Sequence, residues 1–258
     1  MKAMIMAAGL GTRLRPWTLS HPKALVPVEC VPALERLILK LKGHGFDYIV
    51  VNVHHFADQV KSFLHRHDFG IHIEISDESD RLLDTGGALV KATSLLSAVP
   101  GPVLVHNVDI LSNADMGELM DAHMLAGNDV TLMTSMRDSS RKLLFEPDGR
   151  LAGWHKVGTE EYKPGGFKPE SDMTEEAFSG IYVVGERALR DMARYSAELG
   201  DEKFPVMDYF LSIHPDGTQR ADSTPGDIVI RHYMNESLRL LDIGKPEALA
   251  RASGFIED

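Results

Sequence analysis

Short apolar runs alternate with amphipathic segments over the first 135 residues of the chain. Residues 2–6 and 48–53 are almost uninterrupted apolar runs, a pattern typical of strands that are buried on both faces of a parallel sheet. Residues 32–43 and 57–67 instead place their apolar side chains at helical spacing. This alternation predicts an α/β fold built on a doubly wound, mostly parallel sheet.

The same pattern predicts the remaining elements of this half. We expect strands at residues 71–76, 102–106 and 130–135, and helices at residues 85–96 and 115–126. Ligands of such sheets bind at the carboxyl ends of the strands. The loops 9–23, 77–87 and 107–109 should therefore lie along one edge of the sheet and face one cleft.

The pattern changes after residue 140. Two apolar segments around Pro147-Asp148-Gly149 predict a hairpin, and the polar residues 158–176 predict a mobile loop. The apolar residues 177–184 predict a central strand. Further elements follow from the same criteria: helices at 186–194, 205–211 and 245–252, and strands at 219–222, 228–233 and 238–243. We see no repeat or flexible linker, so a single domain spanning residues 1–258 is the simplest organisation.

Composition narrows the class of protein. The net charge of −11 over 258 residues argues against a nucleic-acid binder, which usually presents a basic face. The single cysteine, Cys30, excludes an internal disulfide, and we expect it to be a partly buried apolar residue. No apolar stretch approaches the ~20 residues of a membrane span, and the first residues are too short an apolar run for a secretory leader. We expect a cytoplasmic protein with no membrane partner.

The loop after the first strand is suited to phosphate. Gly9 and Gly11 let backbone amides approach an anion, and Arg13, Arg15 and Lys23 supply positive charge. A dinucleotide-binding fingerprint is excluded because Leu14 stands where a third glycine belongs, and the Gly-Lys-Ser/Thr of a P-loop is absent. Taken alone, a Gly-x-Gly after a strand is more often an ordinary turn than a binding site.

The full spacing Gly9-x-Gly11-Thr12-Arg13-Leu14-x-Pro16, followed by Pro22-Lys23, resembles the signature of the sugar-phosphate nucleotidyltransferases. The compact members, such as the N-acetylmuramate-1-phosphate uridylyltransferases and the mannose-1-phosphate guanylyltransferases, are similar over residues 2–250. The resemblance implies a Rossmann-like fold of the nucleotide-diphospho-sugar transferase type. It also implies Mg²⁺-dependent transfer of a nucleotidyl group from an NTP to a sugar 1-phosphate, with residues 1–135 as the nucleotide-binding half and 136–258 as the β-rich sugar-binding half.

The resemblance also implies roles for individual residues. Arg13 and Lys23 would be catalytic, and Asp109 and Asp242 would bind the metal. The nucleotide would contact the Gly-rich loop, the Gly-Gly helix start and the end of the fourth strand: Ala8, Gly9, Leu10, Gly11, Thr12, Gly86, Gly87 and Asn107. The sugar phosphate would contact Lys156, Ser179 and Gly180.

The chain departs from the family pattern at three of these places. Val108 replaces a glycine between Asn107 and Asp109, which stiffens that turn. Lys156 lacks the usual neighbouring glutamate and proline, and Leu240 replaces an aromatic residue two positions before Asp242. These departures weaken the transfer of roles most strongly for Lys156.

The residue types themselves are suited to this transfer reaction. Joining a sugar phosphate to an NTP gathers negative charge, so positioning and neutralisation dominate catalysis. Two carboxylates at strand ends suit one Mg²⁺. Arg13 can bind phosphate oxygens through two N–H groups of its planar guanidinium, and Lys23 can bind them as a point charge. No acid–base residue is required, because the attacking phosphate oxygen is already ionised.

Other assignments remain open at this point. The acceptor could be a non-sugar phosphate such as phosphocholine, with a cytidylyl group transferred, or the chain could be a catalytically silent nucleotide-binding regulatory subunit. Retention of both the cations and the carboxylates argues against the silent subunit. The histidines at 54, 55, 65 and 67 lack a third ligand at useful spacing, so structural zinc is not expected. The expected partners are small molecules, the NTP and the sugar 1-phosphate, and a homodimer is one possible assembly.

Overall fold

The structure is a computed structural model that describes residues 1–211 and 228–257. The chain divides into two compact units, which are described in turn. The first consists of residues 1–82, 91–117 and 238–258, and the second of residues 83–90 and 118–237. The units therefore interleave along the chain instead of meeting at residue 135, and the assignment of nucleotide and sugar to sequence halves remains a prediction.

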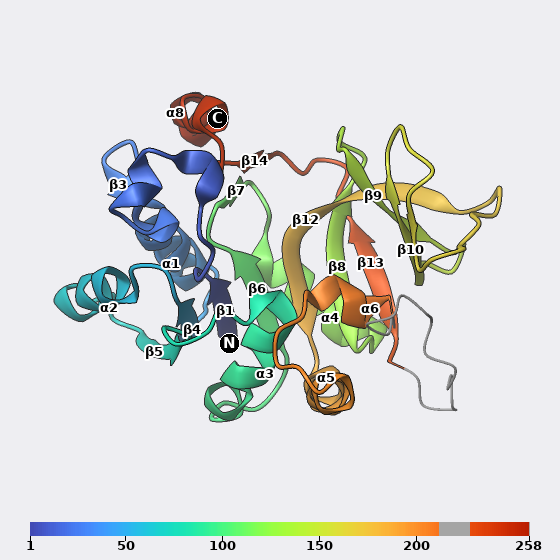
Figure 1. The fold of residues 1–258 in the computed structure, drawn as a ribbon, viewed down its shortest axis with the longest axis horizontal. Coiled ribbons are helices and arrows are strands. Elements are labelled where there is room, and N and C mark those ends of the chain that lie inside the picture. Colours follow the sequence, from blue (N-terminus) through green and yellow to red (C-terminus); the bar gives the residue numbers. More distant parts are fainter. Residues whose placement is uncertain (212–227, 258) are drawn as a thin grey trace. The chain divides into compact units, whose positions relative to one another are not determined.

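The first unit is built on four parallel strands in the order β6-β1-β4-β5 (Figure 1). Their bounds are β1 Lys2–Met6, β4 Tyr48–Val53, β5 His72–Asp77 and β6 Val103–Asn107. β1 has a parallel neighbour on each side, and this explains its apolar run: Ala3, Met4 and Ile5 are completely buried. The predicted α/β class with a parallel sheet is confirmed.

Helices of this unit begin where the spacing of apolar residues changes from that of a strand to that of a helix. Their bounds are α1 Ala33–Gly43, α2 Ala57–Arg66, α7 Pro246–Leu249 and α8 Ala252–Glu257. The single closing helix expected at 245–252 is thus two short helices. α3 Asp84–Leu96 and α4 Met116–Ala126 contribute residues to both units.

The strands of the first unit end in register. Met6 of β1 lies opposite Asn52 on one side and Asn107 on the other. The segments that follow β1, β5 and β6 therefore leave the sheet from the same edge, as predicted for the loops 9–23 and 107–109 and for the part of the loop 77–87 that belongs to this unit, residues 77–82.

The segment after β1 contains three 3₁₀ turns and a small hairpin. The turns are η1 Thr12–Leu14, η2 Trp17–Leu19 and η3 Lys23–Leu25, and the hairpin strands are β2 Pro27–Val28 and β3 Val31–Pro32. The expectation for Cys30 was wrong, because this residue is exposed. Glu29 and Cys30 form the two-residue turn of the hairpin with φ of 49° and 67°, and such a turn turns both residues outward.

The second unit is rich in antiparallel strands. Its elements are β8 Val130–Ser135, β9 Arg141–Phe145, β10 Leu151–Lys156, β11 Tyr162–Lys163, β12 Thr174–Val184, α5 Glu186–Leu199, α6 Val206–Phe210 and β13 Ile230–Met234. β12 pairs antiparallel with both β9 and β8, and β13 pairs parallel with β8.

The polar segment 158–176 is more regular than predicted. It contains β11, which pairs with β10, and the first three residues of β12. A two-residue strand carries too little hydrophobic period to be recognised in a sequence. The strand expected at 219–222 lies outside the described residues.

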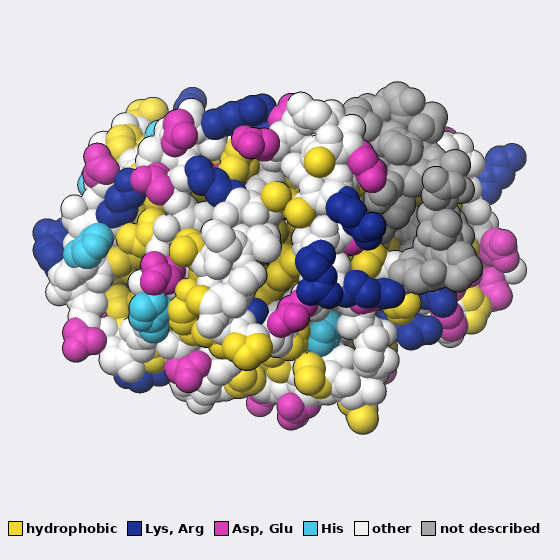
Figure 2. All heavy atoms as spheres, turned by 90° about the horizontal axis from the view of Figure 1, so that it is seen from below, with side chains coloured by type: hydrophobic (Ala, Val, Ile, Leu, Met, Phe, Trp, Pro, Cys, Tyr) yellow, Lys and Arg dark blue, Asp and Glu magenta, His cyan; other side chains and the backbone are white. Residues whose placement is uncertain are grey.

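One face of the molecule carries acidic and basic side chains interspersed among polar and hydrophobic ones (Figure 2). Among the described residues, no helix is long and apolar enough to cross a membrane.

Candidate functional site

Lys23 lies directly across the two glycines of the first loop. A Cβ atom on Gly9 would be 2.9 Å from Cε of Lys23, and one on Gly11 would be 2.8 Å from its Cβ. Gly11 also has a φ of +60°, and its carbonyl accepts a hydrogen bond of 2.8 Å from the Thr18 hydroxyl. Glycine is therefore required at Gly11 for space and for backbone conformation, whereas a Cβ at Gly9 would displace the end of the Lys23 side chain.

The amides of this loop fall into two groups. The N–H groups of Ala7 and Ala8 donate to Oδ1 of Asn52, over 2.7 and 3.3 Å. The next three amides, of Gly9, Leu10 and Gly11, donate to no group within the described part of the chain. Consecutive unpaired amides beside a lysine are suited to bind an anion.

A short two-stranded ribbon brings the two predicted metal carboxylates together. β7 Ile110–Ser112 pairs antiparallel with β14 Leu240–Asp242, and Asp242 lies opposite Ile110, the residue after Asp109. The amide of Ile243 donates to the carbonyl of Asp109 over 2.9 Å. Residues far apart in the sequence thus become neighbours through backbone pairing.

Each carboxylate is paired with one of the predicted catalytic cations. Nζ of Lys23 lies 3.0 Å from Oδ2 of Asp109, and both side chains are largely buried. Nη1 of Arg13 lies 3.2 Å from Oδ2 of Asp242 in a more exposed pair. The four charged groups predicted from the sequence therefore form one cluster. Burial lowers the pKa of the neighbouring His106 to about 4, so its imidazole adds no positive charge near neutral pH.

Gly244 leaves space between the carboxylates. A Cβ atom there would lie 2.8 Å from Oδ1 of Asp242, 3.0 Å from Oδ2 of Asp109 and 2.7 Å from Nη2 of Arg13. Two carboxylate oxygens thus converge on one point that no side chain fills. This geometry fits a small hard cation that takes one or two protein carboxylates and completes its shell with phosphate and water.

No group of three or more His, Cys, Asp or Glu side chains suited to a metal occurs among residues 1–211 and 228–257.

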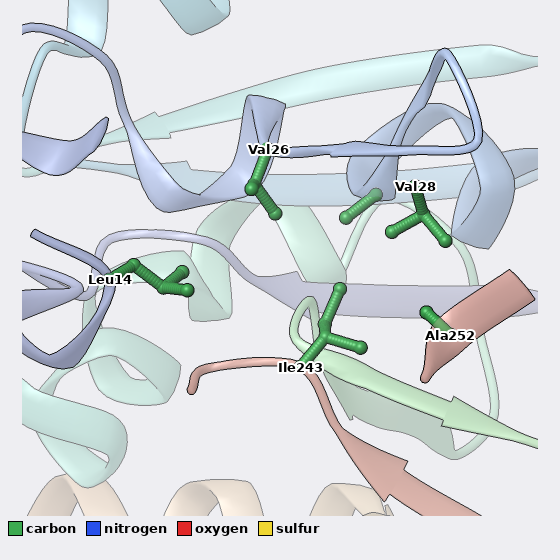
Figure 3. Packing of buried hydrophobic residues seen from close by; sticks show 6 residues of the cluster. Leu14, Val26, Val28, Ile243 and Ala252 are labelled. Carbon is green, nitrogen blue, oxygen red and sulfur yellow. The ribbon is translucent and has the colours of Figure 1, made fainter. Parts of the chain in front are cut away.

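An apolar cluster packs the loop that carries Arg13 against the turn that follows Asp242 (Figure 3). Leu14 of the loop and Ile243 of the turn are members of this cluster, and the others are Val26, Val28, Ala33 and Ala252. Leu14 follows Arg13, and Ile243 stands between Asp242 and Gly244. Burial of the two apolar side chains therefore holds the adjacent charged groups in place.

The predicted residues of the second unit have other contacts. The amides of Gly86 and Gly87 both donate to the carbonyl of Phe204, and a Cβ atom on Gly87 would lie 1.9 Å from the carbonyl oxygen of Glu202. Residues 202–204 pack so closely against Gly86 and Gly87 that no side chain fits at either position, which explains the two glycines structurally. Their predicted role in binding the base remains a prediction.

The predicted sugar-phosphate residues lie on β10 and β12. Lys156 is exposed and its Nζ donates to Glu161 over 3.2 Å. Ser179 is buried, and its hydroxyl donates to the carbonyl of Met133. Gly180 has a φ of +78° and lies within the irregular stretch of the β12–β8 pairing. The hydroxyl of Ser179 thus has a structural role, and contact of these residues with a sugar remains a prediction.

Sequence reasoning missed Asn52 and Gly244. Asn52 lies inside an apolar run, where a polar residue is itself a signal, because burying an amide is costly unless it is hydrogen-bonded. Gly244 lies two residues after Asp242, but only the ribbon pairing reveals that its missing side chain opens the space between the carboxylates.

The family model described as Nucleotidyl transferase matches residues 2–258. N-acetylmuramate alpha-1-phosphate uridylyltransferase of Caulobacter vibrioides is 33% identical over 199 residues, which cover 73% of this chain and 77% of that protein. Mannose-1-phosphate guanylyltransferase catalytic subunit beta of Drosophila pseudoobscura pseudoobscura is 28% identical over 211 residues, 80% of this chain but 54% of that protein. The chain thus spans about half the length of this second relative.

Among solved structures, HddC from Yersinia pseudotuberculosis complexed with GMP-PN has a similar fold, with a TM-score of 0.71, 20% identity and coverage of 99% of both chains. The chain belongs to the nucleotidyl transferase family. It is therefore a nucleotidyltransferase, and sugar-phosphate nucleotidyl transfer is the activity supported at the level of the family.

Proposed function

We propose that this protein catalyses Mg²⁺-dependent transfer of a nucleotidyl group from an NTP to a sugar 1-phosphate, with release of pyrophosphate. The observation that carries the proposal is the convergence of Asp109 and Asp242 on the space beside Gly244, with Lys23 and Arg13 paired to them. A set of two cations and two carboxylates suits phosphoryl chemistry, which needs charge neutralisation more than proton transfer.

In the proposed reaction, an oxygen of the sugar phosphate attacks the α-phosphorus of the NTP. The bond between the α-phosphorus and the oxygen that bridges to the β-phosphorus breaks, and its electron pair leaves with the pyrophosphate. No proton needs to move, because the attacking oxygen is ionised at neutral pH.

The residues of the cluster would then have distinct tasks. Asp109 and Asp242 would hold Mg²⁺, which when bound supplies charge neutralisation to the phosphate oxygens. The triphosphate competes with these carboxylates for the cations, so that Arg13 binds phosphate oxygens through its fork and Lys23 as a point charge. The unpaired amides of Gly9, Leu10 and Gly11 would complete the binding of the NTP.

We propose UTP with N-acetylmuramate 1-phosphate as the first substrate pair to test, because the uridylyltransferase relative is 33% identical and matches over 77% of its length. GTP with mannose 1-phosphate is the second pair, suggested by the guanylyltransferase relative. Phosphocholine with CTP serves as the non-sugar comparison.

The test is pyrophosphate release. The protein is incubated with each NTP and each acceptor, with Mg²⁺ or with EDTA, and pyrophosphate is measured. We expect release only with Mg²⁺ and a sugar 1-phosphate. The Asp109→Asn variant keeps the size of the side chain and an acceptor for Lys23, so it should remain folded and lose turnover.

Three outcomes would contradict the proposal. Absence of release from every pair would reject the reaction, and undiminished release in EDTA would reject the metal. Normal turnover of the Asp109→Asn variant would show that the carboxylate cluster is not the reaction centre.

A further inference from the structure

Asn52 is a buried polar residue that the proposed mechanism does not use. It lies near the carboxyl end of β4 opposite Met6 of β1, and the residue is 3% exposed. Its Oδ1 accepts hydrogen bonds from the amides of Ala7 and Ala8, the last two residues before the Gly-rich loop. An ordinary strand residue at this position would be apolar, like its neighbours Val51 and Val53.

Glu78 selects the orientation of this amide group. Nδ2 of Asn52 donates to Oε1 of Glu78 over 2.8 Å, and Glu78 is completely buried. Rotation of the amide by 180° would set Nδ2 against two N–H donors and Oδ1 against a carboxylate, so only the observed orientation satisfies all the groups.

The position of Glu78 is itself fixed by the backbone after β5. Its amide donates to the carbonyl of Val53 over 2.8 Å, and its own carbonyl accepts from Nδ1 of His54 and from the amide of Arg81. The pair Asn52–Glu78 therefore connects the ends of β1, β4 and β5 through hydrogen bonds of defined polarity.

This polarity decides which loop amides can meet a ligand. The amides of Ala7 and Ala8 are occupied by Asn52, and those of Gly9, Leu10 and Gly11 have no partner within the described residues. If the first two amides were released, the loop would lose the anchor that sets the direction of the next three.

We infer that Asn52, oriented by Glu78, is a positioning residue for NTP binding: it fixes the backbone of Ala7 and Ala8 so that the following amides face the nucleotide. The inference rests on the proposed function only in assuming that this loop binds the NTP. It acts through the backbone and requires no contact between Asn52 and the ligand.

The test exchanges the donor and the acceptor of the pair. In the Asn52→Asp variant the side chain still accepts from Ala7 and Ala8, but it places an acceptor against Oε1 of Glu78. In the double variant Asn52→Asp/Glu78→Gln a donor is restored on the other side. The affinity for UTP and for GTP is measured directly by titration calorimetry with Mg²⁺ present, and the KM for each substrate is measured in parallel.

We expect Asn52→Asp to weaken NTP binding by about tenfold, the cost of one mispaired buried polar contact. The KM for the NTP should rise while that for the sugar phosphate stays unchanged. The double variant should recover to within about threefold of the wild type. A merely structural role of Asn52 would lower the melting temperature without this split between the two substrates.

A matched control is Asn128→Asp. Asn128 is also a buried asparagine with a side chain that bonds on both sides, to Thr131 and to Arg231, but it belongs to the second unit. This variant should bind NTP as the wild type does. If Asn52→Asp does not fold, Asn52→Ser, which has a shorter side chain and one hydroxyl, is measured against the same tenfold expectation.

The inference is overturned if the folded Asn52 variant binds NTP within threefold of the wild type, or if Glu78→Gln restores nothing. The proposed function can fail separately: wild-type protein that binds NTP but releases no pyrophosphate rejects the reaction, while the binding series still decides the role of Asn52. Wild-type protein that binds no NTP rejects both.

Discussion

The substitution Gly244→Ala tests the space between the carboxylates with a single methyl group. The added Cβ would lie 2.7 to 3.0 Å from Nη2 of Arg13, Oδ1 of Asp242 and Oδ2 of Asp109, whereas ordinary contacts of a Cβ begin at 3.4 Å. These three atoms would have to move away by 0.4 to 0.7 Å. The methyl group also occupies the point on which the two carboxylate oxygens converge.

The expected effect falls on catalysis and much less on folding. Misplacement of catalytic groups by about 1 Å can cost about 100-fold in rate, so we expect kcat/KM to fall by roughly 10- to 100-fold. Gly244 does not have a left-handed φ, and the atoms in its way are the ends of side chains. Removal of a glycine from the unfolded chain contributes about 0.4–1 kcal/mol of stability, which offsets the local crowding.

The assay is pyrophosphate release over a range of Mg²⁺ concentrations, together with thermal unfolding. We expect the variant to need more Mg²⁺ and to melt close to the wild type. Gly43→Ala is the matched control, because a Cβ there meets no atom within 4 Å. Gly244→Ala protein with the kcat/KM and the Mg²⁺ dependence of the wild type would refute the assignment of this space to the metal.

Three further predictions concern folding. Gly87→Ala should destabilise the protein by about 1–3 kcal/mol in urea unfolding, because its Cβ would lie 1.9 Å from the backbone oxygen of Glu202; unchanged stability with weaker NTP binding would instead support contact with the base. Ile243→Ala removes a fully buried side chain and should cost about 2–5 kcal/mol by the same measurement, and a loss below about 1 kcal/mol would contradict the packing described. Burial holds the pKa of His106 at about 4, so between pH 4 and 6.5 the unfolded chain binds a proton that the folded protein does not. The free energy of unfolding should therefore fall from pH 7 to pH 5, by about 2 kcal/mol from this group, and His106→Gln should show a smaller fall.

Much of the first unit follows from local sequence. β1 and β4 have the bounds that their apolar runs predict, as does β8 in the second unit, and α1 begins one residue after Pro32 and ends at Gly43 as expected. These elements are buried along one face or on both, so the hydrophobic period records their structure directly. The charged cluster was also predictable, because the spacing around Arg13 and Lys23 is specific.

The rest depends on contacts that no local pattern records. The reason for Gly87 is the backbone of Glu202, far along the chain, and the space beside Gly244 exists only because β14 pairs with β7. Likewise the exposure of Cys30 follows from a two-residue turn between two very short strands. Such features arise from pairing between distant segments, for which residue type and period carry no signal.

The β7–β14 ribbon has a consequence for assembly of the site. Between its two strands the chain makes a long excursion through residues 118–237, most of the second unit, before Asp242 returns to Asp109. Closing so long a loop is entropically costly when the loop is flexible and much cheaper when it is folded. How readily β14 pairs with β7 therefore depends on whether the segment between them is folded. Destabilising substitutions within residues 118–211 should therefore weaken the Mg²⁺ binding proposed for Asp109 and Asp242 without touching either carboxylate, because they act on the segment that returns Asp242 to Asp109.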